Sequence, residues 1–112
     1  MHRGEIWLIN LDPTVGAEIK KSRPAVILSV DEIGVLPLRV IVPITTWKDH
    51  FSQAPWLVQI KPNKQNGLDK ISAADTFQIR SLSTERFIRT IGTVEDETLR
   101  AILEGVKVVI GA

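Results

Sequence analysis

The segment Asp12–Pro24, DPTVGAEIKKSRP, joins two apolar runs and concentrates charge near the start of the chain. Its charged side chains gather toward its end, at Glu18, Lys20, Lys21 and Arg23. A loop of about a dozen residues without regular structure is uncommon in a compact domain and is often functional. Pro24 then opens a β-branched run that would hold Arg23 at the start of a strand. We therefore expect a loop that binds a polyanion, the alternative being a solvated, charged hairpin loop.

The apolar runs on both sides of this loop are typical of β-strands. Strands are expected at Arg3–Asn10, Pro24–Val30, Val35–Ile44, Trp56–Ile60, Lys70–Ala74, Thr76–Arg80 and Phe87–Gly92. Turn residues separate these runs, and Ser83–Arg86 is typical of a single helical turn. Trp7, in the first run, is expected in the core. Many short strands with turns between them favour a mainly β fold, a small barrel with a terminal helix.

The end of the chain has the one clear helical pattern. Its apolar residues recur with helical spacing at Leu99, Ile102, Leu103, Val106 and Ile110. Thr93 is expected to cap the helix, and the acidic run that follows would favour its positive end. The spacing predicts a helix over Val94–Val109, with an apolar stripe that packs on the barrel or on a second subunit.

Length and composition indicate one domain over residues 1–112, with an apolar fraction of 44% that is ordinary for a globular chain. The chain has no cysteine, which excludes disulfides, thiol catalysis and zinc–thiolate sites. We see no signal peptide, and no apolar run nears the roughly 18 residues of a membrane span, so a cytoplasmic protein without membrane contact is expected. Because the net charge is only +1, any nucleic-acid site must come from local clustering.

Several kinds of catalytic site have no support in the sequence. There is no glycine-rich phosphate loop and no HExxH motif, and His2 and His50 are the only histidines. The aspartates are scattered over separate turns, so we expect neither a metal site nor a cofactor.

The remaining polar residues form a cationic and hydroxyl-rich set suited to RNA. Arg23 presents a planar fork that matches phosphate oxygens, and Lys20 and Lys21 add charge for neighbouring phosphates. Thr45 or Thr46, at the end of a strand, could donate to a phosphate oxygen as charge builds up. The alternative for Thr45 is a cap on the segment that follows. Since RNA carries its own nucleophile, the 2′-hydroxyl, such a site needs few groups.

Five segments, taken in their order along the chain, resemble the MazF/PemK family of toxin endoribonucleases. The resemblance is carried by RGEIWLINLDP, GAEIKKSRPAVILS, the strand ending in PIT, GLDKISAADTFQIRSLSTERF and IGTV. It covers nearly the whole chain in the right order. The resemblance implies a partly open barrel with short helices that works as a homodimer. It also implies metal-independent cleavage of single-stranded RNA at short motifs, with 2′,3′-cyclic phosphate and 5′-hydroxyl products, and a cognate antitoxin whose flexible acidic segment blocks the RNA site.

The resemblance also implies roles for individual residues. The family's catalytic arginine and threonine fall on Arg23 and Thr45, and the glutamate of its first loop falls on Glu18. The residues that line the family's RNA groove fall on Ser72 and Gln78. An arginine side chain stays protonated in proteins, which favours Arg23 as an electrostatic clamp and makes Glu18 a candidate base for the 2′-hydroxyl. The alternative for Glu18 is a salt bridge that orders Lys20, Lys21 or Arg23.

Two further functions remain open on the residues. One is a non-enzymatic toxin of the same barrel type that poisons a protein such as DNA gyrase. That function would place the key contacts on the terminal helix, but the helix ends in VKVVIGA, without a charged or aromatic cluster. The other is an inactive family member that only binds a partner.

Overall fold

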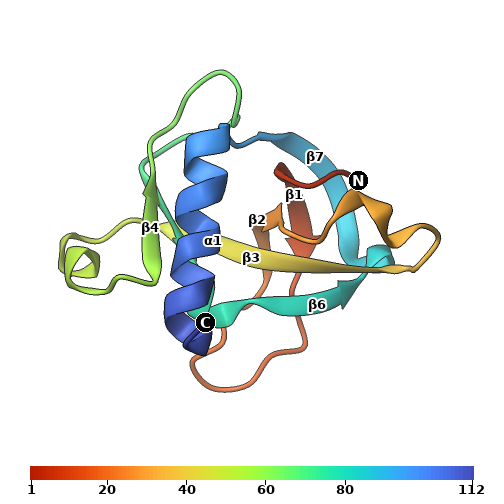
Figure 1. The fold of residues 1–112 in the computed structure, drawn as a ribbon, viewed down its shortest axis with the longest axis horizontal. Helices are drawn as coiled ribbons and strands as arrows, with labels where there is room; N and C mark the ends of the chain where they lie inside the picture. Colours follow the sequence, from red (N-terminus) through yellow and green to blue (C-terminus); the bar gives the residue numbers. More distant parts are fainter.

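One curved, seven-stranded antiparallel sheet and one helix make up the computed structural model, which describes residues 1–112 (Figure 1). The strands are β1 (Glu5–Asn10), β2 (Ser22–Ile27), β3 (Leu38–Thr46), β4 (Leu57–Ile60), β5 (Ser72–Asp75), β6 (Arg80–Ser83) and β7 (Phe87–Thr93). The helix α1 spans Asp96–Ile110. Four short 3₁₀ turns are η1 (Asp31–Ile33), η2 (Asp49–Gln53), η3 (Thr76–Gln78) and η4 (Thr84–Arg86).

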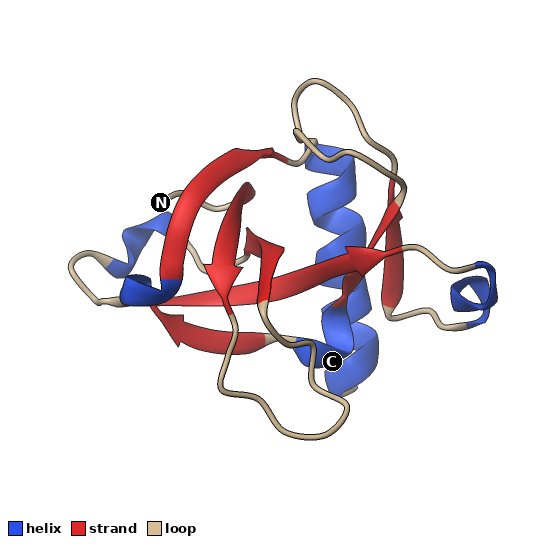
Figure 2. Ribbon diagram, turned by 180° about the vertical axis from the view of Figure 1, so that it is seen from behind, coloured by secondary structure: helices blue, strands red, loops and turns tan.

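The sheet curls without closing. Its strand order is β4-β5-β3-β2-β1-β7, with β6 paired to β3 outside this path. No ladder joins β4 to β7, so the barrel stays open, and α1 lies along the open side (Figures 1 and 2). The expectation of a mainly β, partly open barrel with a terminal helix and short helical turns is confirmed.

Two groups of buried apolar side chains lie on opposite faces of the central strands, since neighbouring residues such as Val26 and Ile27 belong to different groups. The larger one lies under α1 and contains Ile6, Val26, Leu28, Val42, Ile44, Ile60, Ala74, Val94 and Ile102. The smaller one lies near the loop between β1 and β2 and contains Ile9, Leu11, Ala25, Ile27, Ile41 and Leu82. Since β1, β2 and β3 contribute to both groups, these three strands form the rigid centre of the molecule.

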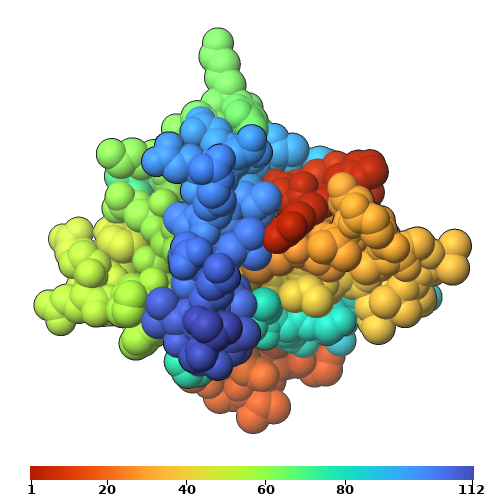
Figure 3. Space-filling view, in the orientation of Figure 1, coloured from red at the N-terminus to blue at the C-terminus, as the bar shows by residue number.

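The helix packs on this core through most of the predicted stripe. Ile102 is fully buried, and Leu99, Leu103 and Val106 pack against the core cluster. Ile110 lies at the end of the helix, is 65% exposed and does not pack on this core. In the space-filling view α1 runs down the middle of the front face, and the β1–β2 loop projects from the lower edge (Figure 3). Neither α1 nor the short turns have the length and apolarity to cross a membrane.

Two local predictions are wrong. Thr93 does not cap the helix, because it ends β7, and the residue at the cap position is Glu95, without a capping side-chain bond. Thr76–Arg80 is not a strand: Asp75 accepts a hydrogen bond from the Phe77 amide and starts the turn η3. Trp7, expected in the core, packs against the smaller core cluster but is only partly buried, and its indole Nε1 donates to Glu5 at 2.9 Å.

A close contact between α1 and η3 yields a test of helix docking. Gly105 is buried against Thr76, so that a Cβ at Gly105 would lie 2.9 Å from both Cγ2 and Oγ1 of Thr76. Thr76 is fully buried and donates to the Trp56 carbonyl at 2.7 Å. Gly105→Ala should lower the free energy of unfolding by about 1–3 kcal/mol through overpacking. This loss outweighs the gain of about 1 kcal/mol from the better helix former.

Urea unfolding measures both this change and its control. The double variant Thr76→Ala/Gly105→Ala removes the two crowding atoms, while the Trp56 carbonyl keeps the hydrogen bond from the Thr76 amide at 3.0 Å. It should regain part of the stability that Gly105→Ala loses. A stabilised Gly105→Ala protein would contradict the close packing of α1 on η3.

Candidate active site

Arg23 and Thr45 line the same small cavity, of about 80 Å³. The cavity lies where β2 begins, where β3 ends and just before β5. Its lining residues are Arg23, Pro24, Ile44, Thr45, Thr46, Lys70 and Ser72. Four of the residues predicted from the sequence are therefore together, and Lys70 joins them without having been predicted.

The register of β2 against β3 brings Arg23 to Thr45. The last paired residues of this ladder are Ala25 and Pro43. Two residues further along the same antiparallel register, Arg23 stands opposite Thr45. Pro24 and Pro43 lack the backbone N–H that would continue the ladder, so the strands are free to separate at this point. The cavity opens in the gap.

β5 closes the other side of the cavity. Thr45 pairs with Ala73, and Thr46 pairs with Ser72. The Ser72 hydroxyl is nearly buried and donates to the Lys70 carbonyl at 2.9 Å, which fixes the chain beside the cavity. Because Thr45 lies inside β3 and the cap position of η2 is Lys48, the alternative that Thr45 is a cap is wrong.

The cavity is cationic and rich in hydroxyl groups. Arg23 is partly buried, and its Nε donates to the Lys20 carbonyl at 3.4 Å. Neither Arg23 nor Lys70 makes an ion pair, and no carboxylate lines the cavity. The lining of the cavity thus combines two cations without ion-pair partners and three residues that carry hydroxyl groups, Thr45, Thr46 and Ser72. Such a set can bind a phosphate and stabilise negative charge on its oxygens.

The neck of the β1–β2 loop is closed by main-chain hydrogen bonds. The Lys21 amide donates to Asp12 Oδ1 at 3.0 Å, and the Lys21 carbonyl accepts from the Leu11 amide at 2.9 Å. The hydrogen bond from Lys21 lowers the pKa of Asp12. Lys20 and Lys21, predicted to bind RNA, are exposed on this loop and line none of the cavities.

Gln78 holds the tip of the loop. Its Oε1 accepts from the Ile19 amide at 2.6 Å, and its Nε2 donates to the Ala17 carbonyl at 3.3 Å and to Asp75 Oδ2 at 3.1 Å. Burial raises the pKa of Asp75 despite these hydrogen bonds. Gln78 does not line the cavity of Arg23 and Thr45, so its place in the structure is that of a loop anchor on η3.

Glu18 also lies outside that cavity. Its Oε1 accepts from the Val15 amide at 2.6 Å, which closes a turn inside the loop. It lines two other cavities, both together with Phe77 and Gln78. No ion pair joins Glu18 to Lys20, Lys21 or Arg23, so the expected salt bridge is absent from the structure.

Two arginines that no sequence pattern predicted bind main-chain carbonyls where the β1–β2 loop begins. Arg80, in β6, donates to the Leu11 carbonyl at 3.3 Å. Arg86, in η4, donates to the carbonyls of Asn10 and Asp12. No local signal marks either residue, because each reaches a segment about seventy positions away.

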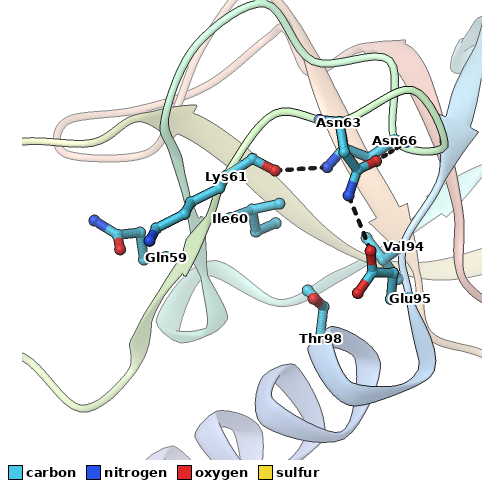
Figure 4. A pocket seen from close by; sticks show the side chains of 8 residues that line it. All are labelled: Gln59, Ile60, Lys61, Asn63, Asn66, Val94, Glu95 and Thr98. Carbon is cyan, nitrogen blue, oxygen red and sulfur yellow. Dashed lines mark hydrogen bonds between the residues drawn. The ribbon is translucent and has the colours of Figure 1, made fainter.

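The other cavities differ in chemistry. One of about 490 Å³ is bounded by Trp56 and Phe77, whose rings meet edge to face with centroids 5.7 Å apart, and by Glu18 and Asp75. Another lies where α1 begins (Figure 4); there Asn63 donates to Glu95 at 3.1 Å. No three His, Cys, Asp or Glu side chains gather as a metal site would require.

Comparison with known proteins identifies relatives over the whole chain. A family model described as "PemK-like, MazF-like toxin of type II toxin-antitoxin system" matches residues 2–110. Endoribonuclease MazF9 of Mycobacterium tuberculosis is 35% identical over 113 residues, covering 96% of this chain and 93% of the relative. Endoribonuclease PemK of Escherichia coli is 30% identical, covering 88% of this chain and 77% of the relative.

Solved structures share the fold. MazF from Deinococcus radiodurans matches with a TM-score of 0.82 at 22% identity, covering 100% of this chain and 97% of that chain. An endoribonuclease in complex with its cognate antitoxin, from a mycobacterial species, matches with a TM-score of 0.77 at 18% identity, covering 99% of this chain and 95% of that chain. With a family model that extends from residue 2 to residue 110, the chain belongs to the PemK-like, MazF-like toxins of type II toxin–antitoxin systems.

Proposed function

We propose that this toxin is a metal-independent endoribonuclease that cuts single-stranded RNA in the cavity shared by Arg23 and Thr45. The observation that carries the proposal is that Arg23 and the hydroxyl-bearing residues Thr45, Thr46 and Ser72 line one cavity, which has no carboxylate. Relatives at 35% and 30% identity are named endoribonucleases, which supports the same activity.

The groups in the cavity suit cleavage in which the 2′-hydroxyl of the RNA is the nucleophile. The 2′-oxygen forms a bond to the adjacent phosphorus, and the bond from phosphorus to the 5′-oxygen of the next nucleotide breaks. The products are a 2′,3′-cyclic phosphate and a 5′-hydroxyl. Arg23 holds the non-bridging oxygens, and Thr45 donates to one of them as negative charge grows. The proton of the 2′-hydroxyl passes to a base, and a proton joins the leaving 5′-oxygen.

The positive charge of the cavity also favours an acidic protein partner. An antitoxin whose flexible, acidic segment crosses the cavity would place carboxylates where the RNA places phosphates, and would fold as it binds. The solved complex of an endoribonuclease with its cognate antitoxin supports a partner of this kind. We further propose that the toxin works as a homodimer in the cytoplasm.

The first test removes the phosphate-binding groups. Arg23→Ala and Thr45→Ala should each slow single-turnover cleavage of a long unstructured RNA by about 100-fold or more, because each removes a donor to the transition-state charge. The assay runs in chelator, and the RNA ends are sequenced. Cleavage by the unaltered protein should persist in chelator.

Matched controls separate these effects from loss of charge or of folding. Arg100→Ala removes an exposed arginine on α1 that lines none of the cavities, and it should leave the rate unchanged. Intact RNA after incubation with the unaltered toxin would refute the nuclease assignment. A toxin that instead inhibits DNA gyrase would support the non-enzymatic alternative.

The second test concerns Glu18 as the base. Glu18→Gln keeps an oxygen that can accept from the Val15 amide, so the turn inside the loop should persist. Because Glu18 lines cavities other than the one shared by Arg23 and Thr45, we expect single-turnover cleavage within a few-fold of the unaltered rate. A loss of about 100-fold, with a changed pH profile, would instead assign the proton transfer to Glu18.

A further inference from the structure

A second cavity lies next to the cavity of Arg23 and Thr45, on the side of β7. It has a volume of about 360 Å³ and is lined by Leu8, Pro24, Gly67, Leu68, Asp69, Lys70, Ser72, Arg89 and Ile91. Pro24, Lys70 and Ser72 line both cavities, so the two are direct neighbours. We call the second cavity the β7 groove.

Arg89 is the cation at the far end of the β7 groove. In the strand ladders it pairs with Leu8, and Leu8 pairs with Pro24. With two strand spacings between them, the backbones of Arg89 and Pro24 lie roughly 10 Å apart. The groove thus extends across β1 from the proposed cleavage site to β7.

The cations of the β7 groove have no partners within the chain. The side chains of Arg89 and Lys70 are exposed and make no hydrogen bond or ion pair. Asp69 is the one carboxylate of the groove, and it too makes no ion pair. Arg80 and Arg86 differ from these cations, because their side chains bind main-chain carbonyls at the start of the β1–β2 loop.

The groove combines these cations with an apolar floor. Leu8, Leu68 and Ile91 line it between Lys70 and Arg89. A nucleotide has the matching chemistry, with a charged phosphate for the cations and a base whose face can lie on apolar side chains. A free phosphate would use only the cations, and an apolar peptide only the floor.

We propose that Lys70 and Arg89 bind a second phosphate of the substrate strand, next to the one held at Arg23. The subsite rests on the proposed nuclease function and extends it, since it gives the direction in which the RNA leaves the cleavage site. In this proposal the RNA runs from the end of β3 past Lys70 and across β1 to β7.

The salt dependence of binding tests this subsite. The probe is a short, fluorescein-labelled, mixed-sequence RNA in which every 2′-hydroxyl is methylated, so that it cannot be cut. Each lost phosphate contact on a single strand should lower the slope of log K against log salt by about 0.7. Fluorescence anisotropy at several salt concentrations should show this loss for Lys70→Gln and for Arg89→Gln. Arg100→Gln, which removes the same charge from α1, should keep the slope of the unaltered protein.

The outcomes separate the subsite from the nuclease assignment. The subsite would be overturned if Lys70→Gln and Arg89→Gln had the same salt slope as the control Arg100→Gln. Altered sedimentation of these variants with unchanged slopes would also overturn it, because the groove would then be a contact between copies of the chain. Cleavage of the unmethylated RNA is scored in parallel. Expected slopes without cleavage would refute the nuclease function alone, and cleavage with unchanged slopes would refute the subsite alone.

Discussion

The antiparallel register of β2 against β3 is the constraint on which the site depends. Ala25 pairs with Pro43, and the same register two residues further sets Arg23 against Thr45. A slip by one residue would turn the side chains of one strand to the other face of the sheet and separate the two groups. The core opposes such a slip, because Val26, Ile27, Ile41 and Val42 are all fully or almost fully buried. The packing that stabilises the sheet therefore also sets the geometry of the phosphate site.

A second set of contacts joins the long loop to this rigid centre. Asp12 binds the Lys21 amide where the two ends of the loop meet, Gln78 binds the tip of the loop, and Arg80 binds the Leu11 carbonyl. These bonds come from β6, from η3 and from the loop itself, so the loop is held from several sides. An ordered loop loses less conformational entropy when it meets a ligand. The arrangement suits the proposed function, in which the site would hold a flexible single strand of RNA in one orientation.

Sequence patterns predicted the strands, the terminal helix and the loop, because burial imposes alternation on strands and a 3.6-residue period on the helix. They failed at Thr76–Gln78, where alternation resembled a strand but the Asp75 carboxylate starts a turn. Among the candidate site residues, Arg23 and the pair Thr45 and Thr46 were predicted from their chemistry and position, and the family resemblance then assigned catalytic roles to Arg23 and Thr45. Lys70 was missed because nothing local distinguishes it from other exposed lysines. Its place beside Arg23 comes from the pairing of β3 with β5, which only the folded chain reveals.

Gln78 touches the loop through main-chain atoms only, the amide of Ile19 and the carbonyl of Ala17. Every residue type except proline offers both groups. The two hydrogen bonds therefore do not depend on the side chains at these positions. The Ile19 side chain nevertheless packs against the smaller core cluster, whereas Ala17 is exposed. The tip of the loop thus combines a fixed main-chain path with one position, residue 17, whose side chain can change without disturbing the core.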